Sequence, residues 1–242
     1  MDGKTDEKTK HHDFIELNYT GKLADGTVFD TTIESVAKTS NLFSEKKSYQ
    51  PAVICIGEKQ ILPGLDAELE GRETGKEYTV TLPPEKAFGK RDVKLVKIIS
   101  ASTFKEHQVE PHPGLQVNID NEIGVITNIS GGRIIVNFNH PLAGKEVTYV
   151  FTIVRKITDK NEQVASFVSS TLGLPKEKMK VEVKEDKAAI TLPLELPLQI
   201  SNILMQRLVE VTGLKDILFE KEKDKTEKAG HKTESIGGKS RF

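Results

Sequence analysis

The sequence predicts an α+β protein whose first part is an antiparallel β-sheet wrapped on a short helix. Three observations carry this prediction. Short segments with a period of two, the pattern of half-buried strands, dominate the chain up to residue 157. Asp25-Gly26 is a strong hairpin signal, because a tight two-residue turn needs the positive φ angles that Asp and Gly tolerate. Beyond residue 157, helical and strand patterns follow one another in the order αββαβ, so we expect a separate C-terminal domain.

Residues 14–32, FIELNYTGKLADGTVFDTT, predict the first hairpin of the sheet. Apolar side chains at positions 15, 17 and 19 alternate with polar ones, so one face of this strand is expected to point inward. Gly21 ends the clean alternation. The return strand carries Val28 and Phe29, and Asp30 places an acid directly after the aromatic ring.

The other elements expected before residue 90 are shorter. They are a helical turn at 33–37, a strand at 52–56 that Pro51 opens, a helix around 65–69 that ends at Gly71, and a strand at 77–82. Pro83 and Pro84 stop the last strand, because proline lacks the N–H that a sheet ladder needs.

The order and spacing of these segments resembles the FKBP-type peptidyl-prolyl cis-trans isomerases. The resemblance rests on the first hairpin, on ILPGL at 61–65 and on PPEKAFG at 83–89. It resumes with NHPLAG at 139–144 and an alternating strand up to residue 157. The resemblance implies an FKBP-like catalytic domain formed by residues 13–90 and 139–157.

Residues 91–138 extend one loop of this domain, which resembles the SlyD-like and larger archaeal FKBPs. We expect a small inserted β-domain with an extended start near 93–98, a helical turn at 102–106, and strands at 115–119, 123–129 and 133–138. By the resemblance this domain has chaperone character and grips unfolded chains. The candidates for this contact are Val93, Leu95, Val96, Ile98, Ile99 and Phe104. The sequence does not show which of these side chains face outward.

Residues 158–222 predict the C-terminal αββαβ domain, which resembles the extra domain of the long archaeal FKBPs. Asp159 or Asn161 can cap its first helix, and prolines near the strand at 190–196 suggest an edge strand. The second helix, 198–211, presents one apolar face formed by Ile200, Ile203, Leu204, Leu208 and Val211. We expect this domain either to form a homodimer or to dock a partner. Residues 1–12 and 223–242 are expected to be a disordered leader and tail.

The resemblance also implies roles for single residues. The proline pocket would be formed by Tyr19, Phe29, Ile61, Leu62, Leu65, Phe88 and Tyr149, with Asp30 at its edge. The Tyr19 hydroxyl would orient Asp30, and the backbone N–H of Leu62 would hold the substrate chain. Leu65 stands where many FKBPs have tryptophan, Phe88 where many have tyrosine, and Ala52 where many have an aromatic wall. We therefore expect a shallow pocket that binds macrolides weakly, with Ala52 and Ile54 as further substrate contacts.

Such a pocket suits rotation about an X–Pro bond, which must break amide resonance against a barrier of ~18–20 kcal/mol. An apolar, water-poor site can lower this barrier, because the twisted amide is less polar than the planar one. A hydrogen-bond donor to a neighbouring carbonyl can assist. No nucleophile and no metal is required, so we expect no cofactor.

Each of these residues also has a simpler explanation. Tyr19, Phe29 and Tyr149 could be core residues of a sheet, and Asp30 could be a turn or cap acid. His140, next to Pro141 in a connecting segment, is expected to be structural. Weak metal contacts are an alternative for His11-His12 and for the polar loop with Glu106, His107, Glu110 and His112, but neither has a Cys partner.

Composition narrows the class of protein. A net charge of −1 gives no global attraction to nucleic acid or acidic lipid. No apolar run approaches the roughly 18 residues of a membrane span. Cys55 is the only cysteine and lies in an apolar run, so we expect a buried thiol in a reducing cytoplasm. The expected partners are unfolded or nascent polypeptides that contain proline.

A second hypothesis is a binding scaffold, either a holdase or an assembly factor, whose pocket is vestigial. The absent aromatic wall and the separate C-terminal domain motivate it. On this hypothesis, Asp30→Ala and Phe88→Ala variants that lack isomerase activity would still suppress aggregation.

Overall fold

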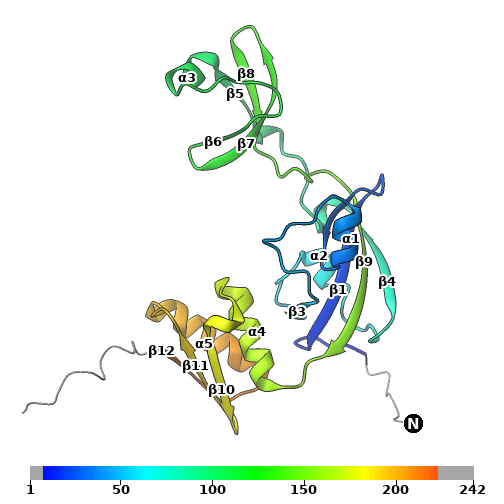
Figure 1. Ribbon diagram of the computed structural model, residues 1–242, viewed down its shortest axis with the longest axis vertical. Helices are drawn as coiled ribbons and strands as arrows, with labels where there is room; N and C mark the ends of the chain where they lie inside the picture. The colour runs from blue at the N-terminus through cyan, green and yellow to red at the C-terminus, as the bar shows by residue number, and fades with distance from the viewer. Residues whose placement is uncertain (1–7, 223–242) are drawn as a thin grey trace, which may run out of the picture. The chain divides into compact units, whose positions relative to one another are not determined.

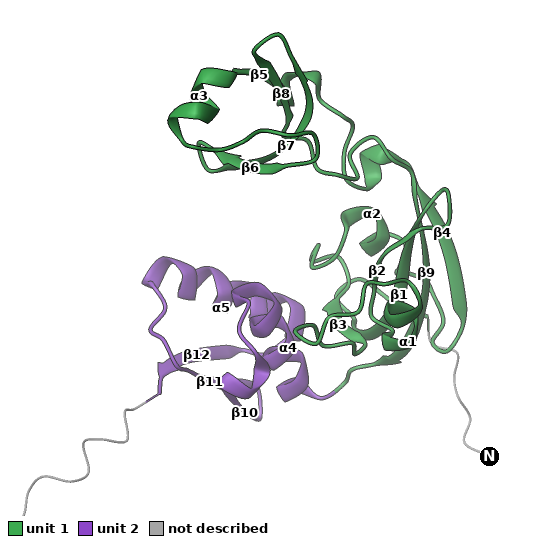
Figure 2. Cartoon of the chain, turned by 45° about the horizontal axis from the view of Figure 1, so that its top comes forward, with its two compact units in different colours: residues 1–158 green, residues 159–242 purple. Residues whose placement is uncertain are grey.

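The computed structural model describes residues 8–222 and divides the chain into two compact units, residues 1–158 and 159–242 (Figure 2). The first unit holds two separate sheets and the second unit holds one. No helix among residues 8–222 is both long and apolar enough to cross a membrane.

The main sheet of the first unit has five antiparallel strands in the order β2-β1-β9-β4, with β3 also paired to β1. The strands are β1 (Phe14–Leu23), β2 (Val28–Thr31), β3 (Ala52–Cys55), β4 (Glu77–Leu82) and β9 (Val147–Lys156). Figure 1 shows β1, β9 and β4 side by side. The short helices α1 (Glu34–Thr39) and α2 (Pro63–Asp66) accompany this sheet. All five strands expected in this part are observed, including both strands of the hairpin, with bounds that shift by at most two residues.

The core of this domain lies between the sheet and α2. Alternate residues of β1 and β9, including Ile15, Leu17, Phe151 and Ile153, are at most 1% exposed. Leu65 of α2 is likewise 1% exposed and belongs to the same cluster. The period of two that was visible in the sequence therefore marks the face that the sheet buries.

The segment 8–12 is part of the fold, so the prediction of a disordered leader over residues 1–12 is wrong for these five residues. Thr9 is 2% exposed, and its hydroxyl donates to the carbonyl of Leu69 at 2.5 Å. The Thr9 N–H donates to Arg72 O and the Gly71 N–H donates to Thr9 O, both at 2.8 Å. These backbone bonds leave no trace in a side-chain pattern. Residues 1–7 lie outside the described part of the chain.

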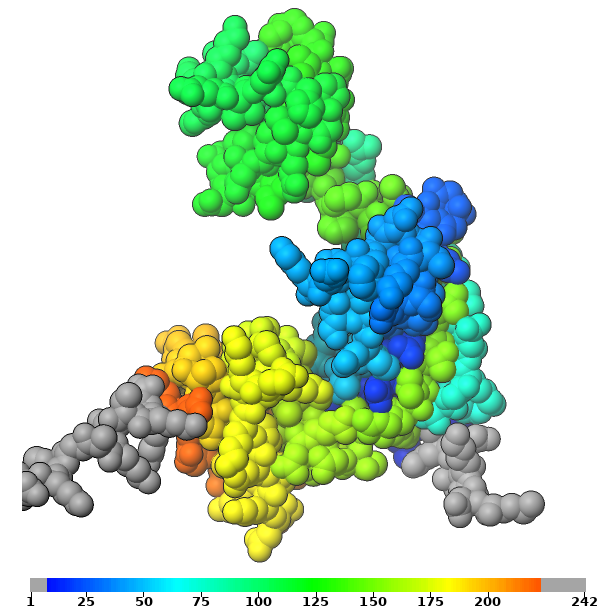
Figure 3. All heavy atoms as spheres, in the orientation of Figure 1, coloured from blue at the N-terminus to red at the C-terminus, as the bar shows by residue number. Residues whose placement is uncertain are grey.

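The inserted residues form a four-stranded antiparallel sheet in the order β5-β8-β7-β6, as expected for a small β-domain. Its elements are β5 (Val96–Ser100), α3 (Ala101–Glu106), β6 (Gln116–Ile119), β7 (Glu122–Ser130) and β8 (Arg133–Asn137). Its atoms form one closely packed body in Figure 3, around a core of Phe104, Ile126, Ile134 and Val136. The expected extended start is wrong at Val93–Leu95, which is a 3₁₀ turn that the Asp92 side chain caps by accepting from Lys94 N.

Asn139 links the two chain segments that connect the inserted domain to the main sheet. Its Oδ1 accepts from the Asp92 N–H at 2.8 Å, and its Nδ2 donates to the Asp92 carbonyl at 2.9 Å. Because one buried side chain satisfies both backbone groups of Asp92, the two ends of the insertion are held together.

The second unit is a three-stranded sheet packed with two helices. Its elements are α4 (Lys160–Leu172), a 3₁₀ turn at Lys176–Lys178, β10 (Lys180–Lys184), β11 (Lys187–Leu192), α5 (Leu198–Thr212) and β12 (Asp216–Lys221). Both helices pack on the sheet and on each other (Figure 1). The Asp159 carboxylate, one of the two candidate caps, caps α4 by accepting from Glu162 N at 2.8 Å, and the helices and strands of this unit follow one another as α4, β10, β11, α5 and β12.

Two details of this unit differ from expectation. The strand predicted over 190–196 at the sheet edge ends at Leu192 instead, and β11 is central, with β10 antiparallel on one side and β12 parallel on the other. Pro193 follows its last residue and so removes no ladder hydrogen bond. The apolar face of α5 is also split, because Leu204 and Leu208 are buried whereas Ile200 and Ile203 are 45% and 66% exposed. The predicted tail, 223–242, lies outside the described residues.

Candidate active site

A cavity of about 530 Å³ opens on the main sheet of the first unit. The residues that line it are Tyr19, Phe29, Asp30, Gln60, Ile61, Leu62, Leu65, Phe88, His140, Leu142 and Tyr149. All eight residues predicted as catalytic are among them. They come from β1, from β2, from α2 and the segment before it, from the turn that follows β4, and from β9. The fold thus gathers residues that are up to 130 positions apart in the sequence.

The cavity wall is aromatic. Phe29 meets both Phe88 and Tyr149 edge to face, with ring centroids 5.7 Å apart and interplanar angles of 81° and 89°. The rings of Tyr19 and Tyr149 meet at 5.9 Å and 62°. These separations fall in the range that edge-to-face aromatic pairs prefer. The rings therefore support one another and present a firm apolar wall to a bound group.

Gly21 makes this arrangement of rings possible. It faces Asp30 of β2 on one side and Tyr149 of β9 on the other. A Cβ atom at this position would lie 2.6 Å from Cζ of Phe29 and 3.0 Å from Cε1 of Tyr149, well inside ordinary contact distance. Gly21 interrupts the alternation of the strand because β1 has no room for a side chain where the rings of Phe29 and Tyr149 lie against it.

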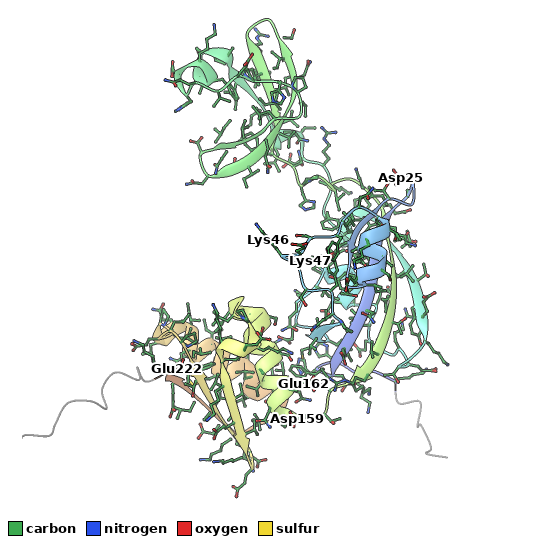
Figure 4. All side chains as sticks on the ribbon, in the orientation of Figure 1. Asp25, Lys46, Lys47, Asp159, Glu162 and Glu222 are labelled. Carbon is green, nitrogen blue, oxygen red and sulfur yellow. The ribbon has the colours of Figure 1, made fainter. Side chains whose placement is uncertain are left out.

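Asp30 stands at the cavity with both carboxylate oxygens engaged. The Tyr19 hydroxyl donates to Oδ2 at 3.0 Å, and Nζ of Lys47 forms an ion pair with Oδ1 at 2.8 Å. Lys47 belongs to the loop between α1 and β3, and Figure 4 shows it next to Lys46. The orientation of Asp30 by Tyr19 agrees with the sequence-based expectation, whereas Lys47 was not anticipated.

The electrostatics of the cavity keep its two tyrosine side chains, Tyr19 and Tyr149, neutral. Burial raises the pKa of Tyr149 to about 12, and the negative charge of Asp30 adds to this shift. The pKa of Tyr19 is raised further, first by burial and then by the charge of Asp30 and the hydrogen bond to it. Both hydroxyls therefore keep their protons at neutral pH and remain hydrogen-bond donors.

The loop before α2 is held in place by a buried carboxylate. Asp66 is 4% exposed, and its two oxygens accept from the backbone N–H groups of Gly57 and Lys59, both at 3.0 Å. This fixes the segment that carries Ile61 and Leu62 into the cavity. Within residues 8–222 the backbone N–H of Leu62 donates no hydrogen bond, as a group that binds a substrate chain would require.

Two predicted substrate contacts, Ala52 and Ile54, do not line the cavity. Ile54 is 4% exposed and belongs to the hydrophobic core, so its prediction as a contact residue is wrong. The reason is register: β3 pairs with residues 14–17 of β1, whereas the cavity is built from Tyr19 onward. Ala52 packs partly buried against the same core.

The candidates in the inserted domain differ in exposure. Val93 and Ile98 are 81% and 66% exposed, whereas Phe104 is 5% exposed. Leu95, Val96 and Ile99 are intermediate. Phe104 nevertheless lines a second cavity, of about 260 Å³, between α3 and β6. This groove also includes Val109, Leu115, Val117 and Ile119, which the sequence analysis did not single out.

Gln60, His140 and Leu142 line the main cavity and were missed as site residues. His140 was expected to be structural, but its ring stacks flat on Phe88 with centroids 4.6 Å apart. The signal that could have found it was its place in NHPLAG, one of the segments that carry the family resemblance. Among residues 8–222, no three His, Cys, Asp or Glu side chains come together in a way that could hold a metal ion.

Comparison with known proteins shows which family this sequence belongs to. Residues 5–105 match the family model described as FKBP-type peptidyl-prolyl cis-trans isomerase, and residues 97–142 match the model described as FKBP26, IF domain.

Three relatives illustrate the similarity. A short-type peptidyl-prolyl cis-trans isomerase of Methanocaldococcus jannaschii is 32% identical over 144 residues, which cover 60% of this chain and 91% of the relative. An FKBP-type 16 kDa isomerase of Escherichia coli is 30% identical over 148 residues, covering 59% and 90%. An FKBP-type isomerase named SlyD, from Treponema pallidum, is 33% identical over 129 residues, covering 48% and 69%. The chain belongs to the FKBP-type peptidyl-prolyl cis-trans isomerases, and its enzymatic class is that of an isomerase acting on polypeptides.

Proposed function

We propose that the cavity at Tyr19, Phe29, Asp30 and Tyr149 is the site where the protein rotates X–Pro bonds in unfolded or partly folded chains. The observation that carries this proposal is the set of edge-to-face rings around an apolar cavity of about 530 Å³. A proline ring fits such a wall, and exclusion of water favours the less polar twisted amide. Asp30, held by Tyr19 and Lys47, is the fixed charge at its edge.

The residue roles are tested by cis-trans isomerisation of a short proline peptide. We expect Phe88→Ala to lower kcat/KM at least tenfold, because it removes a ring that contacts Phe29. Asp30→Ala is expected to lower it as well. The scaffold hypothesis predicts the reverse pattern, in which wild type barely accelerates the peptide and both variants suppress aggregation like wild type.

We further propose that the inserted domain binds unfolded segments and delivers them to this site. The groove between α3 and β6 supports this, because it is lined by apolar side chains and runs along a strand that pairs on one side only. An extended chain can add to such an edge and place alternate side chains in the groove. Binding there raises the local concentration of prolines at the catalytic site of the same molecule.

A pair of matched variants tests the groove. Val109 lines it and is 37% exposed, whereas Ile98 is 66% exposed on β5, at the opposite edge of the sheet. We expect Val109→Asp to weaken catalysis of a proline-limited protein refolding reaction, with kcat/KM on a short peptide unchanged. Ile98, a candidate from the sequence that lies outside the groove, is the control, and under this proposal Ile98→Asp should leave both reactions unchanged. Equal effects of the two variants would contradict the assignment of the groove.

We also propose that the second unit joins two copies of the chain through the exposed side of α5. Leu198, Ile200 and Ile203 are 76%, 45% and 66% exposed on this helix. A second copy offers the same apolar residues, so a two-fold contact would remove both sets from water. Sedimentation of wild type should give a dimer that Ile203→Glu converts to a monomer. Lys178→Gln, a change of equal charge at an exposed position outside α5, should remain dimeric.

We propose a cytoplasmic location for this work. The buried thiol of Cys55 supports it, because the chain holds a single cysteine and no internal disulfide is available to it. Fractionation of cells that express the tagged chain tests this proposal.

A further inference from the structure

The ring of His140 is held at the wall of the main cavity by two separate contacts. It stacks on Phe88 with centroids 4.6 Å apart and an interplanar angle of 2°. The backbone N–H of Leu142 donates to its Nδ1 at 3.1 Å. The first contact fixes the plane of the imidazole and the second fixes its rotation within that plane.

The second contact also decides which ring nitrogen carries the hydrogen. A nitrogen that accepts a hydrogen bond must present a lone pair, so the neutral imidazole of His140 carries its hydrogen on Nε2. Within residues 8–222, Nε2 of His140 has no hydrogen-bond partner. The cavity wall therefore includes an oriented N–H donor that the fold itself does not use.

Of the other polar side chains at the cavity, Tyr19, Asp30 and Gln60 are engaged, whereas the hydroxyl of Tyr149 is a further donor. The Tyr19 hydroxyl donates to Asp30, and Asp30 accepts from both Tyr19 and Lys47. Oε1 of Gln60 accepts from the backbone N–H of Cys55 at 2.8 Å. An enzyme that handles proline in varied sequences can rely only on groups that every such chain contains. These are the pyrrolidine ring and the backbone carbonyl and N–H groups, and of these only the carbonyls can accept a hydrogen bond from a donor such as Nε2–H.

We infer that His140 is a substrate-positioning residue, whose Nε2–H donates to a backbone carbonyl next to the rotating X–Pro bond while its ring extends the apolar wall of Phe88. This inference rests on the proposed role of the cavity as the proline site. The accepted carbonyl is not the one of the rotating amide. The planar amide has the more negative oxygen, so a donor to that oxygen would stabilise the ground state and slow the rotation.

A donor to a flanking carbonyl binds the planar and twisted forms equally well. Its loss should therefore raise KM and leave kcat unchanged. One neutral hydrogen bond corresponds to a change in KM of about three- to tenfold.

Two substitutions separate this role from the alternatives. His140→Asn keeps an acceptor for the N–H two residues later, as in an Asx turn, but loses the ring and the distal donor. His140→Phe keeps a ring that can stack on Phe88 but loses the donor. We expect both variants to raise KM for a short proline peptide three- to tenfold with unchanged kcat. If His140→Asn behaves like wild type, the residue only holds the loop at Leu142, and the inference is overturned. If His140→Phe behaves like wild type, the ring alone matters, and the inference is equally overturned.

Nitrogen NMR supplies a measurement that a structural role would not move. In protein labelled with ¹⁵N-histidine, the Nε2–H signal that disappears in His140→Asn belongs to His140. We expect this signal to shift when a proline peptide saturates the wild-type protein, and an unmoved signal would overturn the inference. Failure of the underlying proposal looks different, because the wild-type protein would then not accelerate isomerisation of the peptide at all.

Discussion

Replacing Gly21 by alanine tests whether the aromatic rings of the cavity form the catalytic site. The new Cβ would lie 2.6 Å from Cζ and 2.9 Å from Cε2 of Phe29, and 3.0 Å from Cε1 of Tyr149. Carbon atoms in contact prefer about 3.5–4.0 Å, so the Phe29 ring must move by about 1 Å or the strand must shift. Overpacking of this kind costs about 1–3 kcal/mol of unfolding free energy. For a unit of this size, the melting temperature should fall by roughly 2–12 °C.

The effect on activity should exceed the effect on stability. A displacement of about 1 Å in a positioning group can lower a rate by about a hundredfold. We therefore expect kcat/KM of Gly21→Ala for a short proline peptide to fall by about ten- to a hundredfold, measured at a temperature where the variant is fully folded.

Gly26→Ala is the matched control. Gly26 lies next to Asp25 at the tip of the same hairpin (Figure 4), with φ at +86° and nothing within 4 Å of a built Cβ. Forcing alanine into this left-handed conformation costs about 1–2 kcal/mol, comparable to the other substitution, but touches no ring. Its kcat/KM should equal that of wild type. The reasoning is refuted if Gly21→Ala keeps full activity, or if both variants lose activity in proportion to stability.

Three further predictions concern other groups. The pKa of Tyr149 is raised from its ordinary value near 10 to about 12 in the folded chain, so the stabilisation from its neutral form is complete below about pH 10 and is lost as the pH rises to about 12. Chemical denaturation between these pH values should show that the unfolding free energy of Tyr149→Phe falls less steeply with pH than that of wild type. Equal slopes would contradict the assignment. Thr9→Val should lower the unfolding free energy by about 1–3 kcal/mol, because it leaves the buried carbonyl of Leu69 without its hydrogen-bond donor. An unchanged midpoint of urea unfolding would show that residues 8–12 are not packed against the domain in solution. Lys47→Met should change kcat/KM by less than about fivefold, because the ion pair of Lys47 with Asp30 is half-exposed and such pairs contribute at most about 1 kcal/mol. The control, Lys46→Met, should leave kcat/KM unchanged. A tenfold loss in Lys47→Met would show that Lys47 acts directly on the substrate.

The elements that the sequence predicted well are those with local causes. The strand at Phe14–Leu23 alternates because the sheet buries one face, and Asp25-Gly26 marks its turn through local backbone preference. The helix starting after Asp159 is set by a cap and a stripe of apolar residues. The residues around the cavity were gathered only through the family resemblance, since no local pattern connects Tyr19 with Tyr149.

The errors have nonlocal causes. Thr9 is fixed by backbone bonds to Gly71 and Arg72 and by its hydroxyl on Leu69, all about sixty positions away, and a single threonine in a polar segment does not signal such distant partners. β11 is central because β12 pairs with it in parallel after a helix, so the prolines beyond its end gave a misleading edge signal. Isoleucine is a residue type that can line a pocket, but the register of β3 places the side chain of Ile54 in the hydrophobic core.

The most direct test of the account replaces residues 93–138 by a short glycine-rich turn and measures catalysis on two substrates. Keeping Asp92 and Asn139 preserves the hydrogen bonds that join the two ends of the insertion. The account predicts that kcat/KM for a short proline peptide stays within about twofold of wild type. For a proline-limited protein refolding reaction it should fall at least tenfold, because the local concentration supplied by the groove is lost. Equal retention of both activities would contradict the role of the inserted domain, and loss of the peptide activity would contradict the assignment of catalysis to the cavity on the main sheet.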